Sequence, residues 1–364
     1  MKYIISIFVA AVFVSLFSVS ASARENYYSE LFEQLPSETA ELLESFGIDE
    51  DLYENYGEIS PLKALETVAG IFRGGLKEPV KIGAVSIALI FIASLITGLS
   101  PGSSSVSSAG RQTALLCIVF YLVKATGDIF SSCCSSLEVT KDFMLVLIPV
   151  FAGIVSFSGN VSLALSFNSV VFTFAEAVAV FFETVFPVLC VVLISVACAC
   201  VINPVVKLNN IGTTLSKLVN LLMAFVAGIF VAVISVRGVI AGAADTVTIR
   251  GIRFLVGNTL PVVGSAIGEA LNSIVAGLGL MKNTVGVLGI AAVLVINLPM
   301  LIKVIIWKCA LYFIGLVADI TGFSEIKAFS ENMNSVLAVI TAAICYVSFV
   351  FIISIAILLT ISKG

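Results

Sequence analysis

Apolar runs long enough to cross a lipid bilayer recur through most of this 364-residue chain and limit the folds that it can adopt. A membrane-spanning helix needs about 20 mostly apolar residues. Clear runs of this kind cover residues 82–99, 113–130, 215–236, 285–306 and 335–361. Residues 143–202 predict two further spans, or three if the first is short, and residues 307–320 could form a partial span. We therefore expect an all-α polytopic membrane protein with about seven to nine transmembrane or re-entrant helices.

The composition agrees with a membrane protein and argues against an enzyme. Hydrophobic residues make up 59% of the chain and charged residues 12%, whereas about a quarter of the residues in soluble domains are charged. Histidine, the commonest general base and metal ligand, is absent. The sequence has no GxxxxGK[ST], GxSxG or HExxH motif, and its eight cysteines form no CxxC pair. We expect no catalytic residues, no metal site and no cofactor, and we interpret the cysteines as small apolar residues.

Residues 1–23 have the pattern of a secretory signal peptide. Lys2 precedes an apolar run, and Ala21 and Ala23 form a small-x-small cleavage site. The alternative is an uncleaved anchor helix. Both interpretations export the segment that follows, although basic residues at 73, 77 and 81 favour the opposite orientation by the positive-inside rule.

Residues 24–80 form an acidic segment that differs from the rest of the chain. Of the 23 acidic residues, 13 lie between Arg24 and Glu78, where only four basic residues occur. The pattern predicts short amphipathic helices, either as a solvated cap or as a docking surface for an extracytoplasmic partner. Residues 81–364 are then the multi-span membrane domain. No basic stripe is present to hold nucleic acid.

Residues 237–289 are rich in glycine. Gly238 with Gly242, and Gly264 with Gly268, fit the small-xxx-small pattern that lets membrane helices approach closely. Pro261 interrupts the apolar run and favours a discontinuous or re-entrant helix pair. This segment is either a translocation element or a site of tight helix packing or interfacial placement.

Several charged residues fall within or beside apolar runs, where each needs a partner or water. Glu176 and Glu183 are seven residues apart, which places both on one helical face. They could line a polar cavity, contact Arg237 or Arg250, or lie near an interface. Together with two further acidic residues they could form a charge relay or a substrate path, and the alternative is a set of structural ion pairs. These two further residues are Asp245 and Glu269.

Lys124 and Asp128 are four residues apart and could pair along one helix face, which would be a structural contact.

A set of short motifs between Ser235 and Ile290 resembles the stage III sporulation protein AE family. The matching positions are Val236-Arg237-Gly238, Ala244-Asp245, Thr248-x-Arg250, Phe254, Pro261-Val262-Val263-Gly264 and Lys282-Asn283-x-Val285-Gly286. A signal peptide, an acidic exported segment and a multi-span domain agree with the family in layout. The N-terminal segment resembles the family only in its acidic composition and expected export, and not in matching residues.

The resemblance implies a role in endospore formation. Its members are thought to belong to a secretion-like channel complex, or feeding tube, in the mother-cell membrane around the forespore. Its implied partners are other products of the same operon, including a cytoplasmic ATPase (stage III sporulation protein AA), and indirectly stage II sporulation protein Q. The complex supports forespore development and late sigma-factor activity. The resemblance supplies no catalytic residues. The chain could also associate with further copies of itself in such a complex. The alternative function is a stand-alone secondary transporter or permease.

Overall fold

The described part of the chain consists of long α-helices. The computed structural model describes residues 40–41, 43–44, 61–99, 104–202, 209–259 and 264–361. These residues contain no β-strand, so the all-α fold class is confirmed. The signal peptide, with Ala21 and Ala23, and nearly all of the acidic segment before residue 61 lie outside the described residues.

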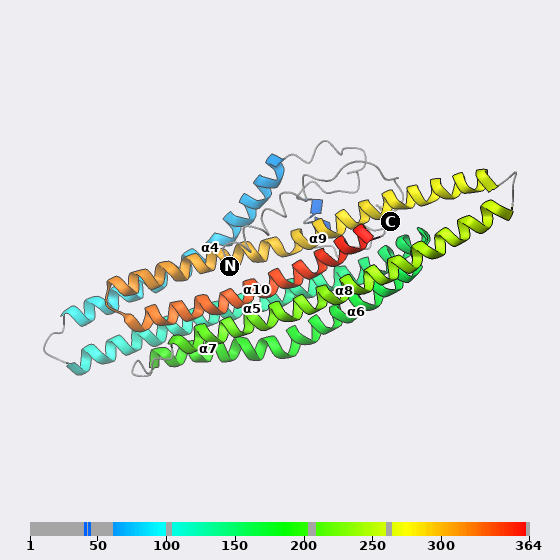
Figure 1. The fold of residues 1–364 in the computed structure, drawn as a ribbon. Coiled ribbons are helices and arrows are strands. Elements are labelled where there is room, and N and C mark those ends of the chain that lie inside the picture. The colour runs from blue at the N-terminus through cyan, green and yellow to red at the C-terminus, as the bar shows by residue number, and fades with distance from the viewer. Residues whose placement is uncertain are drawn as a thin grey trace.

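Seven α-helices and one π-helical turn run in order along the described residues from 61 to 361. They are α4 (Pro61–Leu99), α5 (Ser104–Phe157), α6 (Val161–Val180), η2 (the π-helix Phe181–Val185), α7 (Phe186–Ile202), α8 (Asn209–Thr259), α9 (Gly264–Ile320) and α10 (Ser324–Ile361). Figure 1 shows most of these helices lying side by side along one common direction as an elongated bundle, with the blue first part of α4 at an angle to the rest. Residues 61–80, which the sequence analysis assigned to the exported segment, form the first half of α4.

Six helical segments among the described residues are long and apolar enough to cross a membrane. They are Glu66–Gly98, Ala109–Phe157, Val161–Ala199, Gly212–Thr248, Val285–Ile320 and Ser324–Ile361. The number is slightly below the expected seven to nine because neighbouring apolar runs join into one helix. Residues 285–306 and 307–320 are both part of α9, and the run after residue 143 continues α5.

Three prolines lie inside these continuous helices instead of ending them. Pro79 lies within α4, Pro149 within α5 and Pro299 within α9. Proline removes one backbone hydrogen bond, a loss that membrane helices tolerate because neighbouring groups satisfy the freed carbonyl. Prolines are therefore weaker boundaries in this sequence than in a soluble protein.

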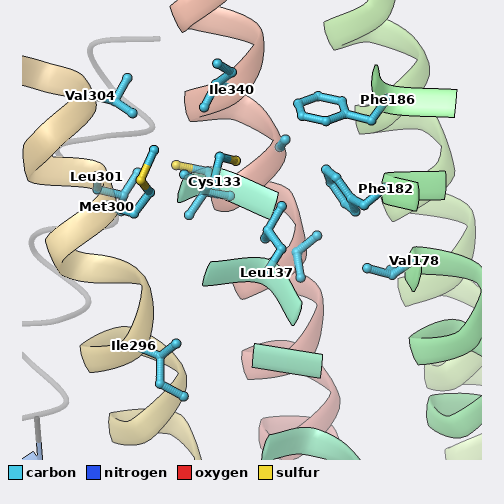
Figure 2. Close-up of a cluster of buried hydrophobic side chains, with 14 of the residues drawn as sticks. Cys133, Leu137, Val178, Phe182, Phe186, Ile296, Met300, Leu301, Val304 and Ile340 are labelled. Atoms are coloured by element: carbon cyan, nitrogen blue, oxygen red, sulfur yellow. The ribbon is translucent and has the colours of Figure 1, made fainter. Parts of the chain in front are cut away.

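Helices α9 and α10 form the centre of the bundle. In the most apolar stretch of each of these two helices, 67% is buried inside the bundle. The corresponding share is 50% in α5 and 22% or less in α4, α6–α7 and α8. Figure 2 shows one part of the core, where Cys133 and Leu137 of α5 lie between the phenylalanines of η2 and α7 on one side and Met300 of α9 on the other. The outer helices therefore present most of the surface.

The exposed side of α8 is a continuous apolar stripe. Its members recur every three or four residues, as expected for one helical face. They include Leu218, Leu222, Phe225, Val226, Ile229, Val233, Val236 and Ile240. Exposed apolar surface of this extent suits contact with lipid or with another protein, not with water.

The described parts of the glycine-rich segment are regular helix. The helix α8 continues to Thr259 and α9 begins at Gly264, and residues 260–263 lie outside the described residues. In Figure 1 the yellow-green end of α8 and the yellow start of α9 extend beyond the other helices. The described backbone therefore forms the two arms of a long helical hairpin, and the expected interruption at Pro261 falls between them.

Candidate functional site

Asp245 of α8 holds the first turn of α6. The backbone N–H groups of Ser162 and Leu163 donate hydrogen bonds to its two carboxylate oxygens, over 3.0 and 2.8 Å. These N–H groups have no partner within α6 because they begin the helix, and Asn160 at the N-cap makes no side-chain capping bond. A carboxylate at a helix N-terminus is also favoured by the helix dipole. Asp245, only 5% exposed, therefore joins α8 to α6.

Gly238 and Gly242 bring α8 against the end of α10. A Cβ atom at Gly238 would lie 2.7 Å from Cδ1 of Ile361, and one at Gly242 would lie 2.4 Å from Cγ2 of the same residue. Both distances are shorter than real Cβ contacts, so only glycine fits without movement of Ile361. This geometry corresponds to the packing interpretation of the first small-xxx-small pair.

The other side of the α10 terminus is held by α9. Lys282, only 2% exposed, donates from Nζ to the carbonyl oxygen of Leu359 over 3.3 Å. A Cβ atom at Gly286 would lie 2.7 Å from Cδ2 of Leu359. A cation beside the last carbonyls of a helix stabilises it through the dipole and satisfies an orphan acceptor. We call the four residues around the end of α10 the terminal clamp: Gly238, Gly242, Lys282 and Gly286.

A second polar contact joins α5 to α9 in the middle of the bundle. Asn297, which is fully buried, donates from Nδ2 to Oγ1 of Thr140 and to the carbonyl oxygen of Val293, both over 2.9 Å. Lys303 of α9 donates to Oγ of Ser132 over 3.1 Å. These residues were not predicted from the sequence. The available signal was that Asn297 is the single polar residue in the apolar run 285–302.

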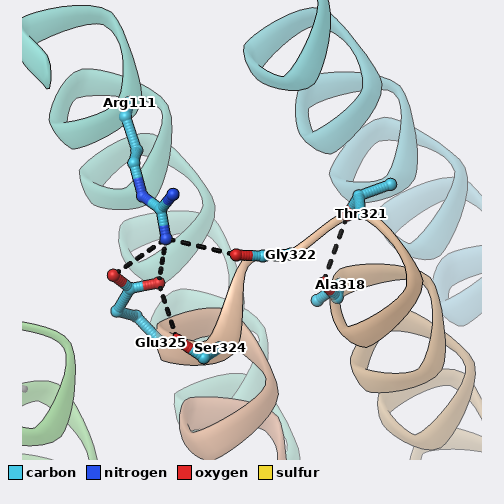
Figure 3. A network of polar contacts seen from close by, with 6 residues as sticks. All are labelled: Arg111, Ala318, Thr321, Gly322, Ser324 and Glu325. Carbon is cyan, nitrogen blue, oxygen red and sulfur yellow. Dashed lines mark hydrogen bonds and ion pairs between the residues drawn. The ribbon is translucent and has the colours of Figure 1, made fainter. Parts of the chain in front are cut away.

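An ion pair fastens the turn between α9 and α10 to the start of α5 (Figure 3). The Arg111 guanidinium lies 2.7 and 3.0 Å from the carboxylate oxygens of Glu325, and it also donates to the carbonyl oxygen of Gly322 over 3.3 Å. Its carbon Cζ lies 4.8 Å from the ring centroid of Phe323. Gly322 has a φ of 80°, a left-handed conformation that glycine adopts readily. This contact was also missed, because its partners are more than 200 residues apart.

Glu176 of α6 and Glu183 of η2 are exposed, as are Arg237 and Arg250 of α8. None of the four makes an ion pair among the residues that the structure describes. Contact of the two glutamates with these arginines, one of the three alternatives, is therefore not formed within the described chain. Glu183 instead lies beside a cavity of about 70 Å³ that Glu138 and Lys141 of α5 also line.

The π-helical turn that contains Glu183 also borders a larger cavity. This cavity of about 390 Å³ lies between α6–α7, α8 and α10, and its lining is almost entirely apolar. π-helical turns are frequent at functional sites, but here the turn places phenylalanines, including Phe181 and Phe182, on the cavity wall. Among the described residues that line the cavity, Tyr346 is the only one with a titratable side chain.

The remaining predicted residues are distributed as follows. Lys124 and Asp128 are both exposed and form no ion pair with each other, so the pair that their spacing allows is not formed in the described chain. Gly264, Gly268 and Glu269 lie in the first turns of α9, where the surroundings of their side chains fall outside the description. Pro261 lies between the described residues 259 and 264.

The cysteines and acidic residues of the described chain form no metal-binding group of three or more ligands. Cys133, Cys190 and Cys345 are buried, whereas Cys117 and Cys309 are exposed. The small apolar role expected for all eight therefore fits the buried thiols better than the two exposed ones.

The comparison with known proteins supplies the family. Residues 47–362 match the family model for stage III sporulation protein AE. The chain belongs to this family. The match includes every described helix from α4 to α10, and it confirms the resemblance that the motifs between Ser235 and Ile290 carry.

A curated relative agrees with the family match. The chain is 23% identical over 359 residues to stage III sporulation protein AE of Bacillus subtilis (strain 168), covering 92% of this chain and 90% of the relative. No solved structure matches the chain. The chain is thus a sporulation-family protein whose helices have the length and composition of membrane spans.

Proposed function

We propose that this protein is a membrane subunit of the sporulation channel complex that links mother cell and forespore, where it supports forespore development and late sigma-factor activity. The observation that carries the proposal is the family match over residues 47–362. This range includes all six candidate spans in full. A member with this many apolar helices is suited to the membrane part of such a complex.

The bundle is suited to a subunit role in two respects. Its outer helices present wide apolar surfaces, among them the exposed stripe of α8, which lipid or neighbouring proteins would cover. Its polar contacts, such as Asp245 with α6 and Arg111 with Glu325, fix one helix to another and hold no substrate. We infer a scaffold or conducting component, with energy supplied by the cytoplasmic ATPase of the same operon.

The proposed location is the mother-cell membrane that surrounds the forespore. The N-terminal acidic segment would then be extracytoplasmic, in the space between the two membranes. Its proposed contacts are other products of the stage III operon and, through them, stage II sporulation protein Q on the forespore side.

The proposal is tested in the endospore-forming host with an affinity-tagged chain that replaces the native copy. We expect the other operon products, including the ATPase, to copurify from sporulating cells in mild detergent, and not from vegetative cells that express the same tagged chain. Deletion of the gene should arrest the forespore and abolish heat-resistant spores. Normal spore counts after deletion, or solute uptake by the purified chain alone in vesicles without any copurifying partner, would overturn the proposal in favour of a stand-alone transporter.

A further inference from the structure

The exposed face of α5 becomes entirely polar over its middle part. The exposed residues there recur every three or four positions, so they lie on one face of the helix. They are Lys124, Asp128, Ser131, Ser135, Glu138 and Asp142. We call this set the polar stripe. At 1.5 Å per residue it extends for about 27 Å, which approaches the ~30 Å hydrocarbon core of a bilayer.

The polar stripe points away from the interior of the bundle. The opposite face of the same helix segment holds buried residues, including Ile129, Cys133 and Leu137. Figure 2 shows Cys133 and Leu137 directed toward the core between α9 and η2. The stripe is therefore an outer surface of the chain.

At the level of Glu138, the polar stripe shares neighbours on α6 and η2 with apolar surface on α8. Val178 and Phe182 line the small cavity together with Glu138, and they also line the large apolar cavity together with Leu222 and Val226 of α8. Leu222 and Val226 are 54% and 57% exposed. At one level of the bundle, α8 thus presents side chains that suit lipid, and α5 presents charges that lipid would exclude.

The charges of the stripe have few partners within the chain. Lys124, Asp128 and Glu138 make no ion pair in the part of the chain that the structure describes. Beside the stripe, Lys141 reaches Asp142 over 3.4 Å, and the cavity of about 70 Å³ between Glu138, Lys141 and Glu183 has room for several water molecules. Hydration is the simplest way to satisfy these groups.

A second copy of the chain packed directly on this face would not satisfy the charges. Copies in one membrane have the same orientation, so a twofold axis along the membrane normal would place parallel stripes against each other. Glu138 would then face Glu138, and Lys124 would face Lys124. Like charges opposed in this way disfavour the contact.

We propose that the polar stripe of α5 borders a water-filled passage between this chain and its neighbours in the assembly. The inference rests on the proposed function, since it needs an assembly. Carboxylates outnumber lysines along the passage wall, where Glu183 of η2 adds to Asp128, Glu138 and Asp142. The passage therefore favours cations over anions.

Thiol accessibility tests the passage. Ser131→Cys and Ser135→Cys are placed singly in a chain whose eight native cysteines are replaced by alanine. Membranes from sporulating cells are treated with a water-soluble trimethylammonium methanethiosulfonate and, separately, with its sulfonate counterpart. Val226→Cys is the matched exposed control on α8, and Leu137→Cys is the buried control on α5.

We expect both stripe cysteines to be modified severalfold faster than either control, and faster by the cationic reagent than by the anionic one. Adding Glu138→Lys to Ser135→Cys should reduce that preference. Protection in membranes together with modification of the purified chain in detergent would show a protein partner on the stripe and overturn the passage. Protection in both preparations would also overturn it.

Two further measurements keep the test independent of folding and of the proposed function. If the cysteine-free chain fails to accumulate, the same two substitutions are made in the native chain and modification is assigned to single peptides by mass spectrometry. Copurification of the operon products without modification of the stripe overturns the passage alone. Modification of the stripe without copurification overturns the proposed function, and the passage would then lie between copies of this chain that do not touch stripe to stripe.

Discussion

At the scale of single residues, buried polar groups in this bundle connect helices that are distant in sequence. Asp245 is the clearest case because its carboxylate accepts two N–H groups at the start of α6. We expect Asp245→Ala to destabilise the protein by about 2 kcal/mol, since it removes a helix cap and leaves buried donors without partners. Asp245→Asn keeps one acceptor oxygen and should lose less stability than Asp245→Ala. Thermal unfolding in detergent measures both, and an Asp245→Ala variant as stable as the parent would contradict the cap.

Asn297 and Thr140 allow a second measurement at the same scale. Their hydrogen bond of 2.9 Å is buried between α9 and α5, and such bonds between membrane helices contribute about 0.6 kcal/mol on average and about 1.7 at most. We therefore expect a coupling energy of about 1 kcal/mol in a double-mutant cycle of Asn297→Val and Thr140→Val. If the stability losses of the two single variants add up to that of the double variant, the two side chains do not interact in the folded protein.

At the scale of helices, the terminal clamp sets how closely α8 and α10 can approach. Because a Cβ atom at Gly242 would lie 2.4 Å from Cγ2 of Ile361, we expect Gly242→Ala to lower the unfolding temperature and Ile361→Ala to restore part of the loss. Gly228→Ala is the matched control on the same helix, since a Cβ atom there meets nothing within 4 Å. It should be neutral or stabilising by up to about 1 kcal/mol, because alanine favours helix. Equal behaviour of the two alanine variants would contradict the close approach.

The helices could be predicted from the sequence more fully than their connections. Apolar runs located every candidate span because burial of side chains in lipid is a local property of the sequence. The joining of residues 285–306 with 307–320 was not predicted, since Trp307 and Lys308 interrupt the run but are accommodated within α9. The role of Asp245 could not be predicted either, because its partners lie 82 and 83 residues away. Tertiary placement, not local pattern, decides whether such a charge caps a helix or lines a path.

At the scale of the whole molecule, the longest helices exceed a bilayer. The helices α5, α8 and α9 have 54, 51 and 57 residues, which correspond to about 77–86 Å at 1.5 Å per residue. The hydrocarbon core is only about 30 Å thick, so large parts of these helices extend beyond it. The hairpin arms of α8 and α9 that pass the other helices in Figure 1 are one such extension. Exposed apolar surface outside the lipid would need cover from neighbouring proteins, as in an assembly.

The number of crossings also fixes the relation between the two ends of the chain. If each of the six candidate spans among the described residues crosses the bilayer once, an even number, the start of α4 and the end of α10 lie on the same side of the membrane. If the N-terminal segment is exported, the C-terminus after Ile361 should be extracytoplasmic as well. Alkaline phosphatase fused after Gly364 should then be active, whereas the same enzyme fused within the α9–α10 turn after Gly322 should be inactive. Green fluorescent protein at the same two positions should show the reverse pattern, because it does not fluoresce after export in the unfolded state. An inactive C-terminal phosphatase with an exported N-terminus would require an odd number of crossings, and one of the six helices would then lie outside the bilayer.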